Sequence, residues 1–203
     1  MKMLEERLRE AATLADVVLT SGGISAGEAD HTRAMLQRLG TVQFWRVAMR
    51  PGRPLAVGLL APAGAISLTR PAGIPIKTSA SSAQNQGNTP PTQRPAVLLG
   101  LPGNPVAAMV SFLMFVRPVL AQLAGEVAAP APLMQAVSTE RMKKRPGRTE
   151  YLRGVLALNE QGQATVCTTG PQGSGVLSSM VQADCIIVLD DARSDVLPGE
   201  CVH

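Results

Sequence analysis

Apolar and polar positions along the first 125 residues follow two periods, one typical of buried strands and one typical of helices. Continuous or alternating apolar runs that end in glycine- or proline-containing turns predict strands. These runs lie at residues 16–20, 41–49 and 55–60, and from residue 96 to the turn that ends at residue 105. Helical spacing predicts helices at 1–14, 31–39 and 106–125, the last with a kink or break at Pro118. Strands that alternate with helices predict an α/β domain over residues 1–125.

The pattern changes after a linker rich in Pro and Ala at residues 126–135. Short alternating runs between glycine-containing turns predict a small antiparallel all-β domain over residues 136–203. Within the first domain, residues 61–95 are rich in Pro, Gly, Ser, Gln and Asn and show little periodicity. Such a composition buries too little area to offset the entropy lost on ordering, so we predict a flexible surface insertion there.

Composition narrows the classes of ligand only slightly. The chain of 203 residues has a formal net charge of +4 and a pI near 9.3, which mildly favours anionic ligands. Much of the excess lies at residues 141–148, which we interpret as a solvated hairpin. No aromatic residue interleaves these charges, so nucleic-acid binding is not expected. Three widely separated cysteines, without a Cys-x-x-Cys pair, indicate neither a disulfide framework nor a zinc site.

A membrane location is not expected either. The helix at 106–125 has about the 20 residues of a membrane span, but Arg117, Pro118 and the strand directly before it favour a helix that covers a sheet. The N-terminus is a charged amphipathic helix and lacks the apolar core of a secretory signal. We therefore predict a cytoplasmic protein.

The turn after the first strand is the first candidate binding site. The segment Ser21-Gly22-Gly23 opens toward a helix, and the backbone N–H groups of such a turn favour an anion. Glu28 and Asp30 follow and would repel an anion unless a divalent cation lies between, so the combination suits a phosphate with Mg²⁺. The alternative is an ordinary strand-to-helix turn in which Asp30 or Thr32 caps the helix. On the residues alone the ordinary turn is the simpler interpretation.

Three arginines around the next turn, Arg46, Arg50 and Arg53, form a second candidate. Residues four apart in a strand share a face, so Arg46 and Arg50 are predicted to clamp one anionic ligand, unless they are ordinary solvated side chains. Leu-Pro-Gly-Asn-Pro at 101–105 is a further turn between a strand and a helix, and hence a further potential anion site. The chain's two histidines are too few for a catalytic triad or a histidine-rich metal site.

Five motifs carry a resemblance to a known family: ADVVLTSGGISAGEADHT, FWRVAMRPGRPLAVG, GLPGNPVAAMVSF, YLRG and TTGPQGSG. In this order and spacing the chain resembles the C-terminal half of the MoeA family of molybdopterin molybdenumtransferases, which includes the E domain of gephyrin. The resemblance implies a partial three-layer αβα molybdopterin-binding domain followed by a small barrel-like β domain. It also implies molybdenum cofactor biosynthesis, in which molybdenum from molybdate is inserted into adenylated molybdopterin with Mg²⁺-dependent release of AMP.

The resemblance assigns roles to individual positions. Asp30 and Arg50 are implied as catalytic residues, and Asp30 and Glu28 as ligands of Mg²⁺. The implied substrate-binding residues are Ser21, Gly22, Gly23, Arg46, Arg53, Pro54, Pro102, Pro105, Arg153 and Ser174. Of these, Arg153 and Ser174 match anion-binding residues that the family's β domain contributes. The family also implies a homodimer and a contact with the molybdopterin adenylyltransferase.

Some features depart from the family pattern. Arg replaces Lys in the turn at residues 49–54, which keeps the charge but changes the donor geometry. Ala107 stands where many members carry Ser, which removes a hydroxyl donor, and Pro171 stands where His is common. The family's preceding domains and the first part of its α/β domain have no counterpart here, so we expect an exposed strand edge and an exposed apolar face. We expect either a piece of a longer enzyme or a binding or scaffold module of the same fold without turnover.

Overall fold

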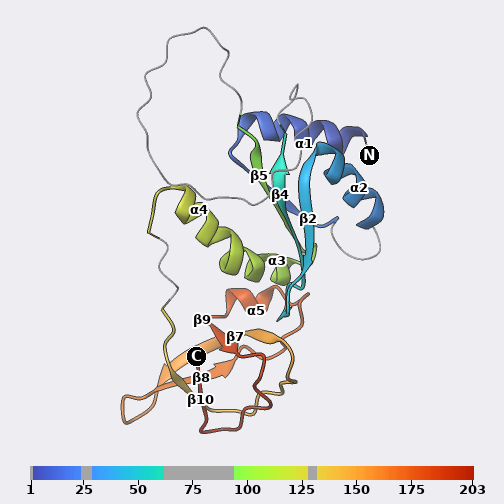
Figure 1. Ribbon diagram of the computed structural model, residues 1–203. Helices are drawn as coiled ribbons and strands as arrows, with labels where there is room; N and C mark the ends of the chain where they lie inside the picture. The colour runs from blue at the N-terminus through green and yellow to red at the C-terminus, as the bar shows by residue number, and fades with distance from the viewer. Residues whose placement is uncertain (1, 24–28, 62–93, 128–131) are drawn as a thin grey trace.

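A computed structural model describes residues 2–23, 29–61, 94–127 and 132–203 (Figure 1). Most of the predicted insertion at 61–95 therefore lies outside the described residues. The first domain contains α1 (Lys2–Leu14), β1 (Val17–Ser21), α2 (Ala29–Leu39), β2 (Gly40–Arg46), β4 (Pro54–Leu60), β5 (Ala96–Leu101), α3 (Pro105–Ser111), a π-helical turn (Phe112–Val116) and α4 (Arg117–Leu123). The second contains β6 (Ala136–Ser138), β7 (Thr149–Leu158), β8 (Ala164–Thr168), α5 (Ser178–Val181), β9 (Cys185–Leu189) and β10 (Cys201–Val202). The two-residue strand β3 (Met49–Arg50) belongs to the second sheet.

Four strands of the first domain form a sheet in the order β1-β5-β4-β2. β1 pairs with β5 in parallel, whereas β4 is antiparallel to both β5 and β2. The ends of β1, β5 and β2 and the start of β4 consequently lie at one edge of the sheet. Every turn that the sequence singled out as a candidate anion site follows or precedes a strand at this edge.

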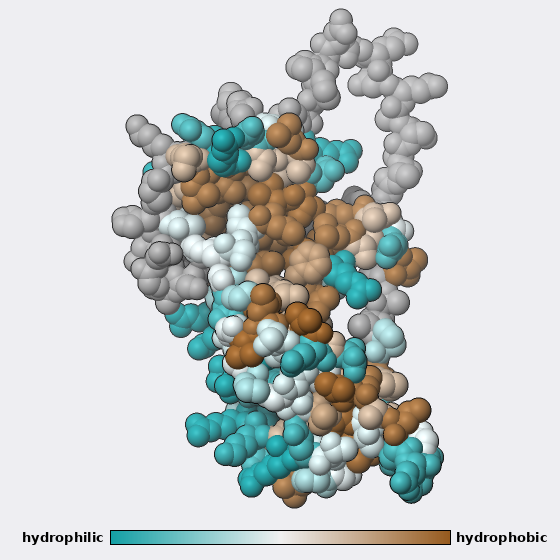
Figure 2. Space-filling model, turned by 180° about the vertical axis from the view of Figure 1, so that it is seen from behind, coloured by the Kyte–Doolittle hydropathy of each residue, from teal (hydrophilic) through white to brown (hydrophobic). Residues whose placement is uncertain are grey.

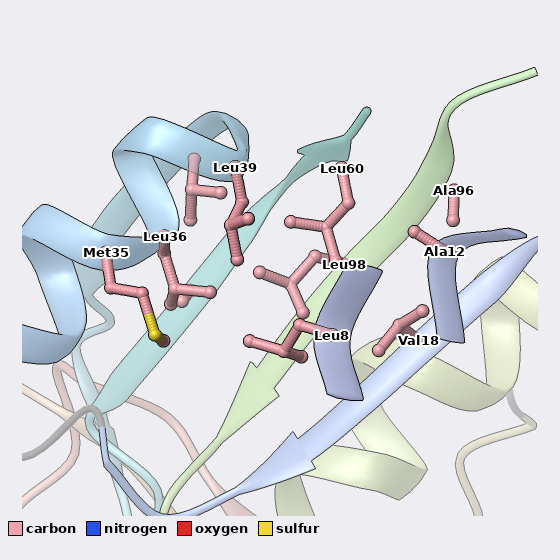
Figure 3. Packing of buried hydrophobic residues seen from close by; sticks show 11 residues of the cluster. Leu8, Ala12, Val18, Met35, Leu36, Leu39, Leu60, Ala96 and Leu98 are labelled. Carbon is pink, nitrogen blue, oxygen red and sulfur yellow. The ribbon is translucent and has the colours of Figure 1, made fainter. Parts of the chain in front are cut away.

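Helices cover both faces of this sheet, which confirms the predicted three-layer α/β class. Figure 3 shows one face, where Leu8 and Ala12 of α1 and three residues of α2 point toward Leu60 and Leu98 of the sheet. The opposite face carries the alternate residues of the same strands, which pack against the π-helical turn at Val116 and its neighbours. Because successive side chains of a strand point to opposite faces of the sheet, the same strands contribute to the hydrophobic core on each face.

Helices α3 and α4 are continuous through the π-helical turn. Pro118, predicted to kink this helix, is the second residue of α4 and lacks the N–H that an α-helical hydrogen bond would use. The wider turn directly before it fits the irregularity that proline imposes. By length and composition Pro105–Leu123 could cross a membrane, as the core helices of many other proteins could, and here the helix lies against the sheet.

A hydrophobic area is exposed on the face of the first domain that Figure 2 shows. Three large apolar side chains of this domain are strongly exposed: Leu19 of β1, Trp45 of β2 and Leu123 of α4. β1 pairs with β5 on one side and, among the described residues, with no strand on the other. The exposed edge and apolar surface expected from the sequence are therefore present in the described part of the chain.

The second domain is a curled β half-barrel, as the sequence predicted. Its strand order is β10-β6-β8-β7-β3, and β9 also pairs with β7. The N–H of Val188 in β9 donates to the carbonyl of His203, directly after β10, at 2.6 Å, so β9 is joined both to β7 and to the β10 end of the sheet. One prediction was wrong: the domain is not purely antiparallel, because β6 pairs with β8, and β3 with β7, in parallel.

The chain crosses between the two sheets at residues 47–50, and this corrects a second prediction. The segment 41–49 is not one strand: β2 ends at Arg46, and Arg50 pairs with Glu150 of β7 in the other sheet. The N–H of Thr149 donates to the carbonyl of Ala48 at 3.0 Å, so the second domain captures the chain directly after β2. Arg46 and Arg50 consequently do not share a strand face.

Candidate oxyanion site at the domain junction

A cavity of about 390 Å³ lies where the two domains meet. The first domain contributes Arg50, Pro51, Gly52 and Ala107 to its lining, and the second contributes residues from β7 and from the loops around it. Its charged lining residues are Arg50, Glu140, Arg141, Lys143, Glu150 and Arg153. Four cations and two carboxylates leave an excess of two positive charges, which favours an anion.

Arg153 of β7 is the most deeply buried of these cations, with 1% of its surface exposed. Its Nε donates to Ser179 Oγ at 3.0 Å and its Nη2 to the carbonyl of Gly173 at 3.3 Å. Burial lowers the pKa of the Arg153 guanidinium from its usual value, and the group stays charged because that value is so high. Among the described residues, no carboxylate forms an ion pair with it. A buried charge without a counter-charge at the wall of a cavity is a site for an anion.

The loop that carries Ser174 is fastened to the strand that carries Arg153. The backbone N–H of Arg153 donates to Gln172 Oε1 at 2.8 Å, and Gln172 Nε2 donates back to the Arg153 carbonyl at 3.1 Å. The N–H of Thr169 donates to the same carbonyl at 3.0 Å. These bonds hold residues 169–174 against β7, and Arg153 and Ser174 line the same cavity.

The two carboxylates of the cavity have defined partners. Glu150 is 5% exposed, and its Oε1 lies 3.7 Å from Arg50 Nη1. Glu140 Oε1 accepts hydrogen bonds from the N–H of Thr168 at 2.8 Å and from its hydroxyl at 2.6 Å. Both carboxylates thus have protein partners, an ion pair for Glu150 and hydrogen bonds for Glu140, and the charge of Arg153 is left for a ligand.

The glycine turn after β1 lies beside the Leu-Pro-Gly-Asn-Pro turn after β5. The N–H of Gly22 donates to the Leu101 carbonyl at 3.0 Å, and the hydroxyl of Ser21 donates to the Pro102 carbonyl at 3.1 Å. A Cβ on Gly103 would lie 3.2 Å from the Cα of Gly22, so only a residue without a side chain fits this contact easily. The two candidate turns therefore form one continuous surface.

The predicted residues divide into three groups. Arg50, Arg153 and Ser174 line the cavity. A second group lies at the sheet edge and outside the cavity lining: Ser21, Gly22, Gly23, Arg46, Arg53, Pro54, Pro102 and Pro105. Glu28 lies outside the described residues, and of Asp30 the structure describes only the backbone, in the first turn of α2. Within the described part of the chain, no cluster of three or more His, Cys, Asp or Glu forms a metal site, so the predicted Mg²⁺ ligands stay a prediction.

Sequence reasoning missed Glu140, Glu150, Gln172 and Ser179. Glu150 offered a signal, because it is a charged residue inside a run that otherwise alternates as a strand with a buried face. Gln172 lies inside the motif TTGPQGSG but received no role, and Ser179 offered no signal, because its partner Arg153 lies 26 residues away.

Two family models together match nearly the whole chain. Residues 1–122 match the model described as "Probable molybdopterin binding domain". Residues 135–203 match the model described as "MoeA C-terminal region (domain IV)". The junction between the matches coincides with the segment that joins the two domains, and the cavity is lined from both.

Known proteins similar to the chain carry consistent names. Molybdopterin molybdenumtransferase of Haemophilus influenzae is 38% identical over 199 residues, which cover 98% of this chain and 41% of the relative. Gephyrin of Dictyostelium discoideum is 28% identical over 209 residues, which cover all of this chain and 27% of the relative. The crystal structure of a molybdopterin biosynthesis MoeA protein from Pyrococcus horikoshii shares the fold with a TM-score of 0.62 at 22% identity, over 98% of this chain and 39% of that one. The chain thus spans less than half of the length of each of these relatives.

Proposed function

Since the chain belongs to the MoeA family of molybdopterin molybdenumtransferases, we propose that it supplies the molybdate site and part of the pterin-binding surface for molybdenum insertion. In this proposal molybdenum from molybdate enters adenylated molybdopterin, and AMP is released. The chain's role in molybdenum cofactor biosynthesis is to hold the two substrates next to each other.

The observation that carries the proposal is the buried guanidinium of Arg153. Three of its five N–H groups have no hydrogen-bond partner among the described residues, because Ser179 and Gly173 take one each. A tetrahedral oxyanion such as molybdate offers acceptors for a guanidinium fork, and the neighbouring Ser174 is a polar side chain on the same wall. The cavity volume of about 390 Å³ leaves room for the anion and for a part of a second ligand.

The edge of the first sheet suits an extended, anionic second ligand. Successive strands lie about 4.8 Å apart, so the Ser21 end of β1 and the Arg46 end of β2, three strands away, are separated by roughly 15 Å. Glycine turns with exposed backbone lie at one end of this edge, and Arg46 and Arg53 lie at the other, next to the cavity turn. We propose that adenylated molybdopterin binds along this edge, with its reactive end toward the cavity.

Several further properties are proposed from membership of the family, without a contact in the structure that supports them. Mg²⁺, held by Asp30 and Glu28, would neutralise the phosphates of the substrate. A homodimer, a contact with the molybdopterin adenylyltransferase and a cytoplasmic location complete the proposal. Arg50 would act on the anion together with Arg153, since both line the cavity.

The test combines binding with turnover. Titration calorimetry should show one molybdate per chain, and Arg153→Ala should weaken it on the order of a hundredfold, because a desolvated charged partner is lost. Arg148→Ala removes one positive charge from an exposed position outside the cavity and should change little. The second assay measures AMP release and molybdenum bound to pterin after mixing adenylated molybdopterin, molybdate and Mg²⁺.

The outcomes separate enzyme from scaffold. AMP release that depends on molybdate and on Arg153 supports the enzyme proposal. Binding of molybdate without AMP release would favour a binding or scaffold module of the same fold. Equal molybdate affinity of the Arg153→Ala and unmodified chains would contradict the assignment of the cavity.

A further inference from the structure

We propose that Ser179 is a positioning residue that fixes the guanidinium plane of Arg153 for the bound oxyanion. This inference rests on the proposed function, because it concerns the same cavity, and it names a residue that does not itself line the cavity. Ser179 is 1% exposed and belongs to α5, a single helical turn that follows the Ser174 loop.

The hydrogen bonds of Ser179 leave its hydroxyl with one orientation. Its Oγ donates to the carbonyl of Val176 at 2.6 Å, and a carbonyl can only accept. The hydroxyl proton is therefore committed to Val176, and the oxygen lone pairs must face Arg153. The Nε–H of Arg153, 3.0 Å away, is the donor that they accept.

Fixing Nε fixes the whole guanidinium group. The group is planar, so a bond at Nε together with the Nη2 bond to the Gly173 carbonyl sets the direction of the remaining N–H groups. Without Ser179 the side chain keeps only the longer bond, at 3.3 Å, and can rotate about its last torsions. The donors would then meet an anion in many orientations, and affinity falls as their alignment is lost.

The position of Ser179 is itself set by packing across the domain junction. Met180, the next residue of α5, packs against a cluster of buried residues from the first domain, formed by Met49, Val106 and Val110. Figure 1 shows α5 between the strands of the β domain and α3. The first domain therefore packs against α5, whose Ser179 orients Arg153, so both domains contribute to the geometry of the anion site.

Molybdate titration of five chains tests the inference: the unmodified chain, Ser179→Ala, the control Ser178→Ala, Arg153→Lys, and the double variant Arg153→Lys/Ser179→Ala. Ser178 is the exposed neighbour in the same turn, and its hydroxyl makes no hydrogen bond among the described residues.

Ser179→Ala should weaken molybdate binding about tenfold, as loss of a hydrogen bond to a charged group predicts, and Ser178→Ala should not. Lysine keeps the charge but has no Nε–H at this place, so adding Ser179→Ala to Arg153→Lys should change affinity by less than about twofold.

A spectroscopic measurement separates positioning from a general loss of structure. The ¹H–¹⁵N signal of the Arg153 Nε–H should be resolved in the unmodified chain, because the group is buried and hydrogen-bonded. It should be shifted or lost in Ser179→Ala while the backbone amide spectrum away from α5 is unchanged.

The possible results distinguish the inference from the proposed function. Unchanged affinity in Ser179→Ala, or a further tenfold loss in the Arg153→Lys background, would overturn the positioning role alone, provided that molybdate binding depends on Arg153. If the unmodified chain binds no molybdate, the proposed function fails and the positioning role fails with it.

Discussion

Arg50 of the first domain and Glu150 of the second form an ion pair across the domain junction, with Arg50 Nη1 3.7 Å from Glu150 Oε1. The two residues are register partners in the parallel pairing of β3 with β7. The Glu150 side chain is almost fully buried, whereas the Arg50 side chain is 65% exposed and reaches the carboxylate from the solvent side. Arg50 therefore neutralises a carboxylate that would otherwise repel an anion in the same cavity.

This pair predicts a rescue between two substitutions. Arg50→Ala should weaken molybdate binding about tenfold, because it removes a cation and also leaves Glu150 without its partner. Adding Glu150→Gln removes the repulsive charge, so the double variant should recover most of the loss. Titration of both variants measures the effect. A double variant as weak as Arg50→Ala would show that the charge of Glu150 does not act on the anion.

Ala107 offers a gain of affinity. It lines the cavity from the first turns of α3, at a position where the family often carries Ser. Ala107→Ser should add a hydroxyl donor to the cavity and tighten molybdate binding about threefold to tenfold, the effect of one added hydrogen bond. Ala108→Ser, on the neighbouring residue outside the cavity lining, is the matched control. Equal effects of the two substitutions would exclude a direct contact.

Gly52 is required by its backbone and by its surroundings. Its φ is +102°, and a Cβ there would lie 2.5 Å from Ser111 Oγ. Gly52→Ala should lower the free energy of unfolding by about 3 kcal/mol or more, because strain and a steric clash add. Gly125→Ala is the control for strain alone, at about 1 kcal/mol, since its φ is +86° and a Cβ there would contact nothing within 4 Å.

Urea unfolding of both glycine variants measures the difference. The Ser111 hydroxyl is buried without a hydrogen-bond partner among the described residues. Ser111→Ala should therefore remove the clashing atom with little loss in the free energy of unfolding. The variant Gly52→Ala/Ser111→Ala should therefore regain part of the lost stability. Equal destabilisation by Gly52→Ala and Gly125→Ala would mean that the turn moves away from α3 without penalty.

Asp195 makes the stability of the β domain depend on pH. Hydrogen bonds from the N–H of Lys144 at 2.9 Å and from Arg141 at 2.6 Å lower the pKa of its carboxyl group. Because the pKa is lower in the folded state, the ionised carboxyl group stabilises the folded protein at pH values above the unfolded-state pKa, which is near 3.8. This stabilisation is lost as the pH falls through the folded-state pKa. Asp195→Asn should therefore be less stable than the unmodified chain at neutral pH, and the difference should shrink in acid.

Chemical unfolding at neutral and at acid pH checks this sign. Asp191→Asn is a suitable control, because the Asp191 carboxyl group makes no hydrogen bond or ion pair among the described residues. A difference between Asp195→Asn and the unmodified chain that grows on acidification would contradict the assignment.

Local patterns in the sequence were sufficient for most of the fold. The strands β1 and β5 were recognised because each is a continuous apolar run that ends in a glycine or proline turn, although β1, at the sheet edge, is only partly buried. β2 and β4, which pair antiparallel in the structure, were each recognised as an apolar run on either side of the turn rich in Pro and Arg. Prediction failed where the chain changed sheets: nothing in residues 47–50 reveals that β7, a hundred residues later, pairs with Arg50.

The candidate site shows the same limit. Motif resemblance placed Arg50, Arg153 and Ser174 among the site residues, and the structure brings these three to one cavity. The prediction for Lys144 was wrong, because residues 141–148 were expected to be a solvated hairpin and this side chain is buried. Its Nζ donates to the carbonyls of Arg145 and Arg193. Burial and partners of this kind depend on tertiary contacts, which a charge count along the chain does not contain.

The most direct test of the central claim is an anomalous difference map from crystals of the chain soaked in molybdate. The account predicts a molybdenum peak in the cavity at the domain junction, within hydrogen-bond distance of the Arg153 guanidinium and next to Ser174. A molybdenum peak only at the Ser21–Gly23 turn or on the outer surface, with none beside Arg153, would contradict it.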